Sequence, residues 1–143
     1  MIEKQAVDRE KALLIGVIRP GITENIVHEH LDELELLADT AGAEVVGRVT
    51  QKVSRINAAT FLGKGKAQQV IDQAAALGVS LILFDDELSP AQIKNYHQMS
   101  QETKILDRSG LILNIFQKHA RTKEARTQVD LAYLEYLLPR LTR

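Results

Sequence analysis

The chain contains no cysteine and no tryptophan, and its aromatic residues are three phenylalanines and three tyrosines. Without cysteine it cannot form disulfides, cysteine-ligated zinc sites, iron–sulfur clusters or a thiol nucleophile. So few aromatic rings argue against a platform for stacking single-stranded bases. No apolar run approaches the roughly 18 residues that a membrane-spanning helix needs, and the first residues lack the apolar core of a signal peptide. We therefore expect a cytoplasmic protein without a membrane span.

The composition that is present favours one folded domain. The 143 residues are 45% hydrophobic and 26% charged, and they include only eight glycines and three prolines. This length supports one hydrophobic core but is too short for two ordinary domains. The modest glycine and proline content, together with the apolar fraction, argues against wholesale disorder.

Short apolar runs alternate with amphipathic stretches along most of the chain. The runs are rich in branched residues, and the stretches repeat apolar positions at spacings of three and four residues. We expect strands at residues 12–18, 44–53, 79–84 and 104–106, and helices at residues 24–41, 66–77 and 90–102. Alternation of this kind predicts an α/β fold with a small parallel sheet of about four strands and helices on both faces.

Local signals mark the ends of several of these elements. Thr23, Ser89 and Asp107 each stand where a side-chain oxygen can cap the first turn of a helix, and Pro90 suits the first helical position. The mixed polarity of residues 44–53 places that strand nearer an edge of the sheet.

No strand is expected after Asp107, because residues 109–119 and 122–143 both have helical periodicity. The chain is therefore divided into an α/β domain at 1–107 and a helical linker at 108–143. Leucines in the last helix recur at spacings of 3, 4 and 3, which is the pattern of a coiled-coil seam. They are Leu131, Leu134, Leu138 and Leu141. This seam predicts either a partner helix or a homodimer. Pro139 is expected to kink the helix or to leave local backbone groups unpaired.

Charge is unevenly distributed on a chain whose net charge is −1. Residues 1–107 carry 11 basic and 16 acidic side chains, whereas residues 108–143 carry 7 and 3. Basic residues gather around the expected break between the last two helices, and a second basic stretch without acids lies between Val45 and Ile71. These two zones indicate a local anionic partner, with an ordinary solvated or salt-bridged surface as the alternative.

The cluster Gly63-Lys64-Gly65-Lys66 precedes a helix, where backbone N–H groups can hold a phosphate. A P-loop would need glycine where Thr60 stands and a hydroxyl residue where Ala67 stands, so this is not a P-loop. An anion or RNA contact through the loop remains one interpretation, and a plain glycine-rich helix entry is the other.

The remaining polar clusters do not predict catalysis. Asp85-Asp86-Glu87 follows the most apolar strand, but three consecutive acids point in different directions and favour a solvated loop over a magnesium site. Asp107-Arg108-Ser109-Gly110 has the short Asp-x-x-Gly pattern of GTPase switch regions, which is better explained by Asp107 as a helix cap. The four histidines are scattered and lack metal-ligand spacing.

Several long stretches resemble the HflX family of ribosome-associated GTPases. These are FLGKGK at 61–66, LFDDELSPAQ at 83–92 and LDRSGLIL at 106–113. Residues 116–143, with ARTKEAR at 120–126 and LLPRL at 137–141, are similar to the linker helix of that family. The resemblance extends over essentially the whole chain.

The resemblance implies an α/β N-terminal domain followed by the first helix of an antiparallel coiled coil. The GTPase domain, with its GTP and Mg²⁺, would lie outside this chain, which would then be no enzyme and hold no cofactor itself. Implied partners are that GTPase domain in cis and the large ribosomal subunit with its RNA. Family members associate with this subunit, and some split stalled ribosomes under stress.

Carried over to this sequence, the resemblance makes the basic residues candidate RNA contacts. They are Lys118, Arg121, Lys123, Arg126 and Arg140, with Lys64 and Lys66 as a second group. Gly63 and Gly65 are weaker candidates for holding a phosphate. The alternative function is a nucleotide-binding or ATP-hydrolysing α/β domain that uses the 63–66 loop and the acids at 85–87.

Overall fold

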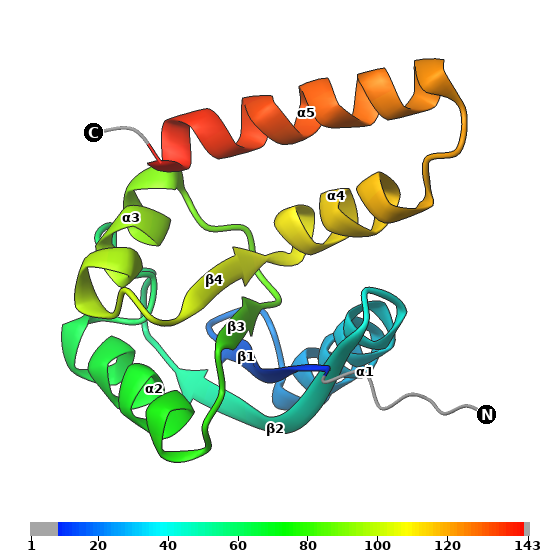
Figure 1. Ribbon diagram of the computed structural model, residues 1–143. Coiled ribbons are helices and arrows are strands. Elements are labelled where there is room, and N and C mark those ends of the chain that lie inside the picture. The colour runs from blue at the N-terminus through cyan, green and yellow to red at the C-terminus, as the bar shows by residue number, and fades with distance from the viewer. Residues whose placement is uncertain (1–8, 142–143) are drawn as a thin grey trace.

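The computed structural model describes residues 9–141, and its strands and helices alternate in the expected order (Figure 1). The elements are β1 (Glu10–Ile18), α1 (Glu24–Thr40), β2 (Ala43–Lys52), α2 (Lys64–Ala76), β3 (Leu81–Phe84), α3 (Pro90–Met99), β4 (Lys104–Asp107), α4 (Arg108–His119) and α5 (Lys123–Leu141). Among them no helix combines the length and apolar character needed to cross a bilayer.

The four strands form one sheet in which all pairs are parallel, in the order β2-β1-β3-β4. Every residue of β3 is buried, as are residues 12–17 of β1, because both strands lie inside the sheet with helices over each face. The partly polar β2 lies at an edge, as its composition predicts. The predicted α/β fold with a parallel sheet of four strands is confirmed.

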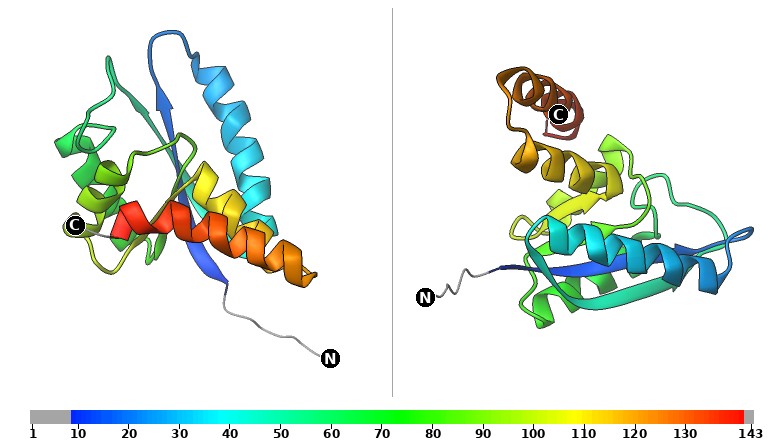
Figure 2. Two further views of the ribbon diagram at one scale, coloured as in Figure 1. Left: turned by 90° about the horizontal axis from the view of Figure 1, so that it is seen from above. Right: turned by 90° about the vertical axis from the view of Figure 1, so that its right-hand side faces the viewer.

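Helices cover both faces of the sheet, as the alternation of elements predicts (Figure 2). On one face, apolar residues of α2 and α3 pack with Leu13, Ile15, Ile82 and Phe84 of the sheet. On the other face, α1 and Leu111 of α4 pack with alternate residues of the same strands. Each central strand therefore contributes side chains to two cores, which explains its continuous run of apolar residues.

The predicted helix caps are confirmed. The side chains of Thr23, Ser89 and Asp107 accept hydrogen bonds from the backbone of the third residue in each helix. Several boundaries differ from the prediction, and β3, for example, begins at Leu81, later than residue 79. Helix α2 begins at Lys64 because Gly63 (φ 94°) supplies its N-cap, and α3 ends at Met99, earlier than residue 102, because Ser100 is extended.

Helices α4 and α5 form an antiparallel hairpin beside the sheet, and the last turns of α5 reach α3 (Figures 1 and 2). Both helices were predicted, but an antiparallel coiled coil built on the leucine seam is not confirmed. Tyr136 is buried on the inner side of α5, whereas the four seam leucines are all more than half exposed. Helix α5 continues through Pro139 to Leu141.

Candidate functional site

The turn between α4 and α5 gathers three of the predicted cations. Ala120 has an extended backbone and ends α4, and the hydroxyl of Thr122 accepts a hydrogen bond from the Ala125 N–H at 3.0 Å. This cap starts α5 within three residues of the end of α4. As a result Arg121, Lys123 and Arg126 lie around one tip of the helical hairpin, together with the positive N-terminal end of the α5 dipole.

These three cations, which we call the cationic turn, are exposed and form no ion pair with a carboxylate in residues 9–141. The guanidinium of Arg126 donates to the Ala120 carbonyl at 3.4 Å. The neighbouring Asp130 instead accepts from the amide of Gln117 at 3.3 Å. The described part of the turn is therefore not a salt-bridged surface, and an ordinary solvated surface stays the alternative to an anionic partner.

Two other predicted cations lie away from this turn and have structural contacts. The ammonium of Lys118 donates to the Ala41 carbonyl at 2.6 Å, which ties α4 to the end of α1. Arg140 lies near the opposite end of α5, where it donates to the carbonyl oxygens of Tyr136 at 2.7 Å and Leu88 at 3.5 Å.

The glycine-rich loop lies on α2, at the far side of the sheet from the helical hairpin (Figure 1). Lys64 and Gly65 are exposed in the first turn of α2. The ammonium of Lys66 donates to the Lys52 carbonyl and so ties the helix to the end of β2. The structure does not bring this second candidate group together with the cationic turn.

The prediction that the acids at residues 85–87 form a solvated loop is wrong for Asp85 and Asp86. The side chains of Asp85 and Asp86 are only 11% and 19% exposed. Asp85 accepts from Arg108 Nε at 3.0 Å, and Asp86 accepts from Arg19 at 3.0 Å. Burial raises the pKa of Asp86, and the hydrogen bond from Arg19 opposes that rise. No group of side chains suited to a metal ion is found in the described part of the chain.

The same acids border a cavity of about 560 Å³ beyond the carboxyl ends of β1 and β3. The strand order reverses between these two strands, which is where open parallel sheets usually bind ligands. Phe61 lines this cavity with a positive φ of 68°, an unusual conformation for a side chain with a β-carbon. The two arginines there are already paired with carboxylates, so the cavity offers no uncompensated cation for a phosphate.

Asp107 has a larger role than the predicted cap. Its carboxylate is fully buried and accepts three hydrogen bonds, from the Leu88 N–H at 3.0 Å, the Gly110 N–H at 2.9 Å and the Tyr136 hydroxyl at 2.6 Å. Burial raises the pKa of Tyr136, and the bond to Asp107 adds to that rise. The sequence offered no signal for the contact with Tyr136, which lies 29 residues further along.

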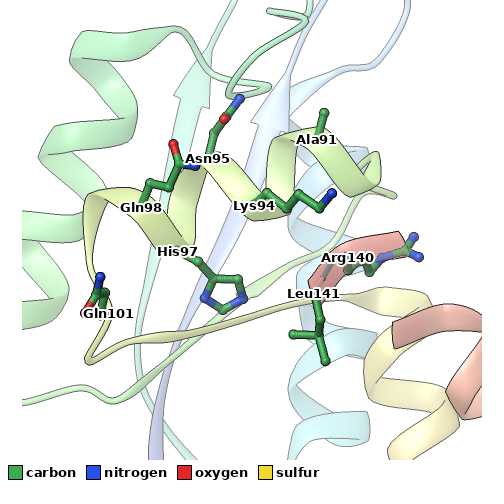
Figure 3. Close-up of a pocket in the computed structure, with 8 residues that line it drawn as sticks. All are labelled: Ala91, Lys94, Asn95, His97, Gln98, Gln101, Arg140 and Leu141. Atoms are coloured by element: carbon green, nitrogen blue, oxygen red, sulfur yellow. The ribbon is translucent and has the colours of Figure 1, made fainter. Parts of the chain in front are cut away.

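A second cavity, of about 640 Å³, lies between α3 and the last turn of α5 (Figure 3). We call it the α3–α5 groove. Its described lining includes two cations, Lys94 and Arg140, and no carboxylate. Sequence analysis did not find this groove because its two walls are more than forty residues apart.

The chain is an α/β domain with a parallel 2-1-3-4 sheet, and most of it matches a known family of N-terminal domains. Residues 28–117 match the family described as GTP-binding GTPase N-terminal. Among solved structures, a GTP-binding protein from the archaeon Sulfolobus solfataricus in complex with GDP is similar with a TM-score of 0.71 and 26% identity. That match covers 92% of this chain and 38% of the archaeal one.

Curated relatives define the particular family. GTPase HflX of Flavobacterium psychrophilum is 48% identical over 142 residues, which is 99% of this chain and 34% of that protein. GTPase HflX of Escherichia coli is 39% identical over 134 residues, covering 94% and 30% respectively. The chain belongs to the HflX family of GTPases, and it spans about a third of the length of these relatives.

Proposed function

We propose that this chain is the N-terminal, RNA-binding region of an HflX-like GTP-binding protein that associates with the large ribosomal subunit. The observation that carries the proposal is the cationic turn, where Arg121, Lys123 and Arg126 are exposed and have no carboxylate partner among the described residues. Such side chains are available to neutralise phosphates, and the released counter-ions favour binding.

In the proposed mechanism this region acts by orienting the protein on the RNA and takes no part in the chemistry. The turn is presented at the tip of a hairpin fastened to a rigid sheet, so an RNA contact there fixes the orientation of the whole domain. Hydrolysis of GTP with Mg²⁺ is assigned to a GTPase domain joined in cis, in line with the name of the relatives. Binding of the large subunit would position that domain, and splitting or rescue of stalled ribosomes would be the outcome.

The test is co-sedimentation of this chain with purified large ribosomal subunits across a salt series. In the variant Arg121→Gln/Lys123→Gln/Arg126→Gln we expect affinity to fall at least tenfold near 0.1 M salt, with a salt slope shallower by about 2. The matched comparison is Lys123→Gln against Lys11→Gln, since Lys11 is also exposed but lies at the start of β1. Equal binding and equal slope for the triple variant and the unsubstituted chain would contradict the proposal.

A further inference from the structure

The α3–α5 groove places two positive charges from separate elements on one concave surface. Figure 3 shows Lys94 extending from α3 toward the segment of α5 that carries Arg140, with His97 on the same side of α3 and Leu141 opposite it. No acidic side chain is among the described residues of its lining. A negatively charged ligand therefore meets attraction in this groove without a competing carboxylate.

Arg140 is held in place before any ligand arrives. Its guanidinium carbon lies 3.7 Å from the centroid of the Tyr136 ring, and its two terminal nitrogens donate to the carbonyls of Tyr136 and Leu88. The Nε atom is buried and has no hydrogen-bond partner. Every partner of this guanidinium in the described structure is neutral, so its charge is not cancelled by an ion pair.

The other polar groups of the groove are compatible with a phosphate. Lys94 supplies an ammonium group without a described ion pair, and burial lowers the pKa of His97, which keeps its imidazole neutral and able to donate one N–H near pH 7. The last carbonyls of α5 add only a partial negative charge, about half an elementary charge. Two full cations outweigh it, and a guanidinium with an ammonium matches the oxygens of a phosphate.

From this geometry we infer that the α3–α5 groove binds a phosphate group of an RNA backbone through Lys94 and Arg140. The inference rests on the proposed function, because it assumes that RNA is the partner of this domain. Helix α5 has 19 residues and is therefore about 28 Å long. The groove and the cationic turn at its two ends must then contact different phosphates, which gives the domain two points of attachment.

The experiment is an NMR titration of the isotope-labelled chain with a short oligouridylate and, separately, with inorganic phosphate. We expect the RNA to shift the amide resonances of Lys94, His97 and Leu141. In Lys94→Gln the dissociation constant read from these shifts should rise about five- to tenfold, while Lys11→Gln should leave it unchanged. Arg140→Lys keeps the positive charge but loses the planar set of guanidinium N–H donors. This variant should weaken the same shifts while its spectrum remains that of a folded chain.

Three results would overturn the inference. These are RNA-induced shifts confined to the cationic turn, shifts in the groove that Lys94→Gln does not alter, and shifts produced by inorganic phosphate but not by RNA. All three leave ribosome binding through the cationic turn intact. Failure of the ribosome co-sedimentation with groove shifts still present would instead contradict the proposed function alone.

Discussion

Asp107 shows how one buried carboxylate can join four parts of this chain. It ends β4 and caps α4. It also accepts hydrogen bonds from the backbone N–H of Leu88, just before α3, and from the hydroxyl of Tyr136 on α5. A buried charge is tolerated only when its oxygens are hydrogen-bonded, and here three donors are present. The attachment of the helical hairpin to the sheet therefore depends in part on a single tyrosine hydroxyl.

We predict that Tyr136→Phe destabilises the chain by about 1.5–3 kcal/mol, since it removes a hydrogen bond to a buried charge while keeping the ring. Urea unfolding followed by circular dichroism measures this loss. The control is Tyr133→Phe on the same helix, whose hydroxyl has no hydrogen bond in the described structure. A loss that is equal in the two variants would show that the bond to Asp107 contributes nothing specific.

At the scale of elements, side chains of α1 pack directly against the backbone of β1 at Gly16. Gly16 makes this approach possible, since a β-carbon there would lie 2.7 Å from Val27 Cγ1 and 2.9 Å from Leu31 Cδ1. Both contacts belong to fully packed side chains of the core beneath α1. The small residue in the middle of an otherwise branched strand is therefore explained by the helix above it.

Gly16→Ala should destabilise the chain by about 1–3 kcal/mol because α1 must shift or its side chains must leave their rotamers. Thermal or urea unfolding reports the change. Gly65→Ala is the matched control, because its added β-carbon meets nothing within 4 Å in the first turn of α2. That control should be neutral or stabilising by up to about 1 kcal/mol. A Gly16→Ala chain as stable as the control would refute the close-packing argument.

For the molecule as a whole, the seam of α5 is a row of exposed leucines on one helix of the described structure. Leu131 and Leu134 are 58% and 53% exposed on the outer side of the hairpin. Exposed leucines in a regular row favour association with another helix. We propose that this surface forms a homodimer interface when the chain is studied alone.

We therefore expect sedimentation equilibrium to detect a concentration-dependent dimer that Leu131→Ser/Leu134→Ser converts to a monomer. Leu36→Ser is the control, because Leu36 is 70% exposed on α1 and stands outside the seam. A chain that remains monomeric at high concentration, or a dimer that the seam variant does not weaken, would contradict the proposal.

Local signals predicted much of this fold. Branched apolar runs predicted β1 and β3, and side-chain oxygens suited to capping predicted the starts of α1, α3 and α4. The mixed composition of β2 predicted its position at an edge of the sheet. Prediction was poorer for the candidate site. The cationic turn follows from adjacent residues, whereas the pairing of Asp85 with Arg108 joins side chains 23 positions apart.

The sequence by itself determined the alternation of elements, their caps and the family to which the chain belongs, because those properties depend on neighbouring residues and on motif identity. Only the tertiary structure decided the strand order, the three donors on Asp107, and the meeting of Lys94 with Arg140 in one groove. These contacts arise when apolar faces from distant segments pack together. The positions that packing brings together cannot be read from local spacing.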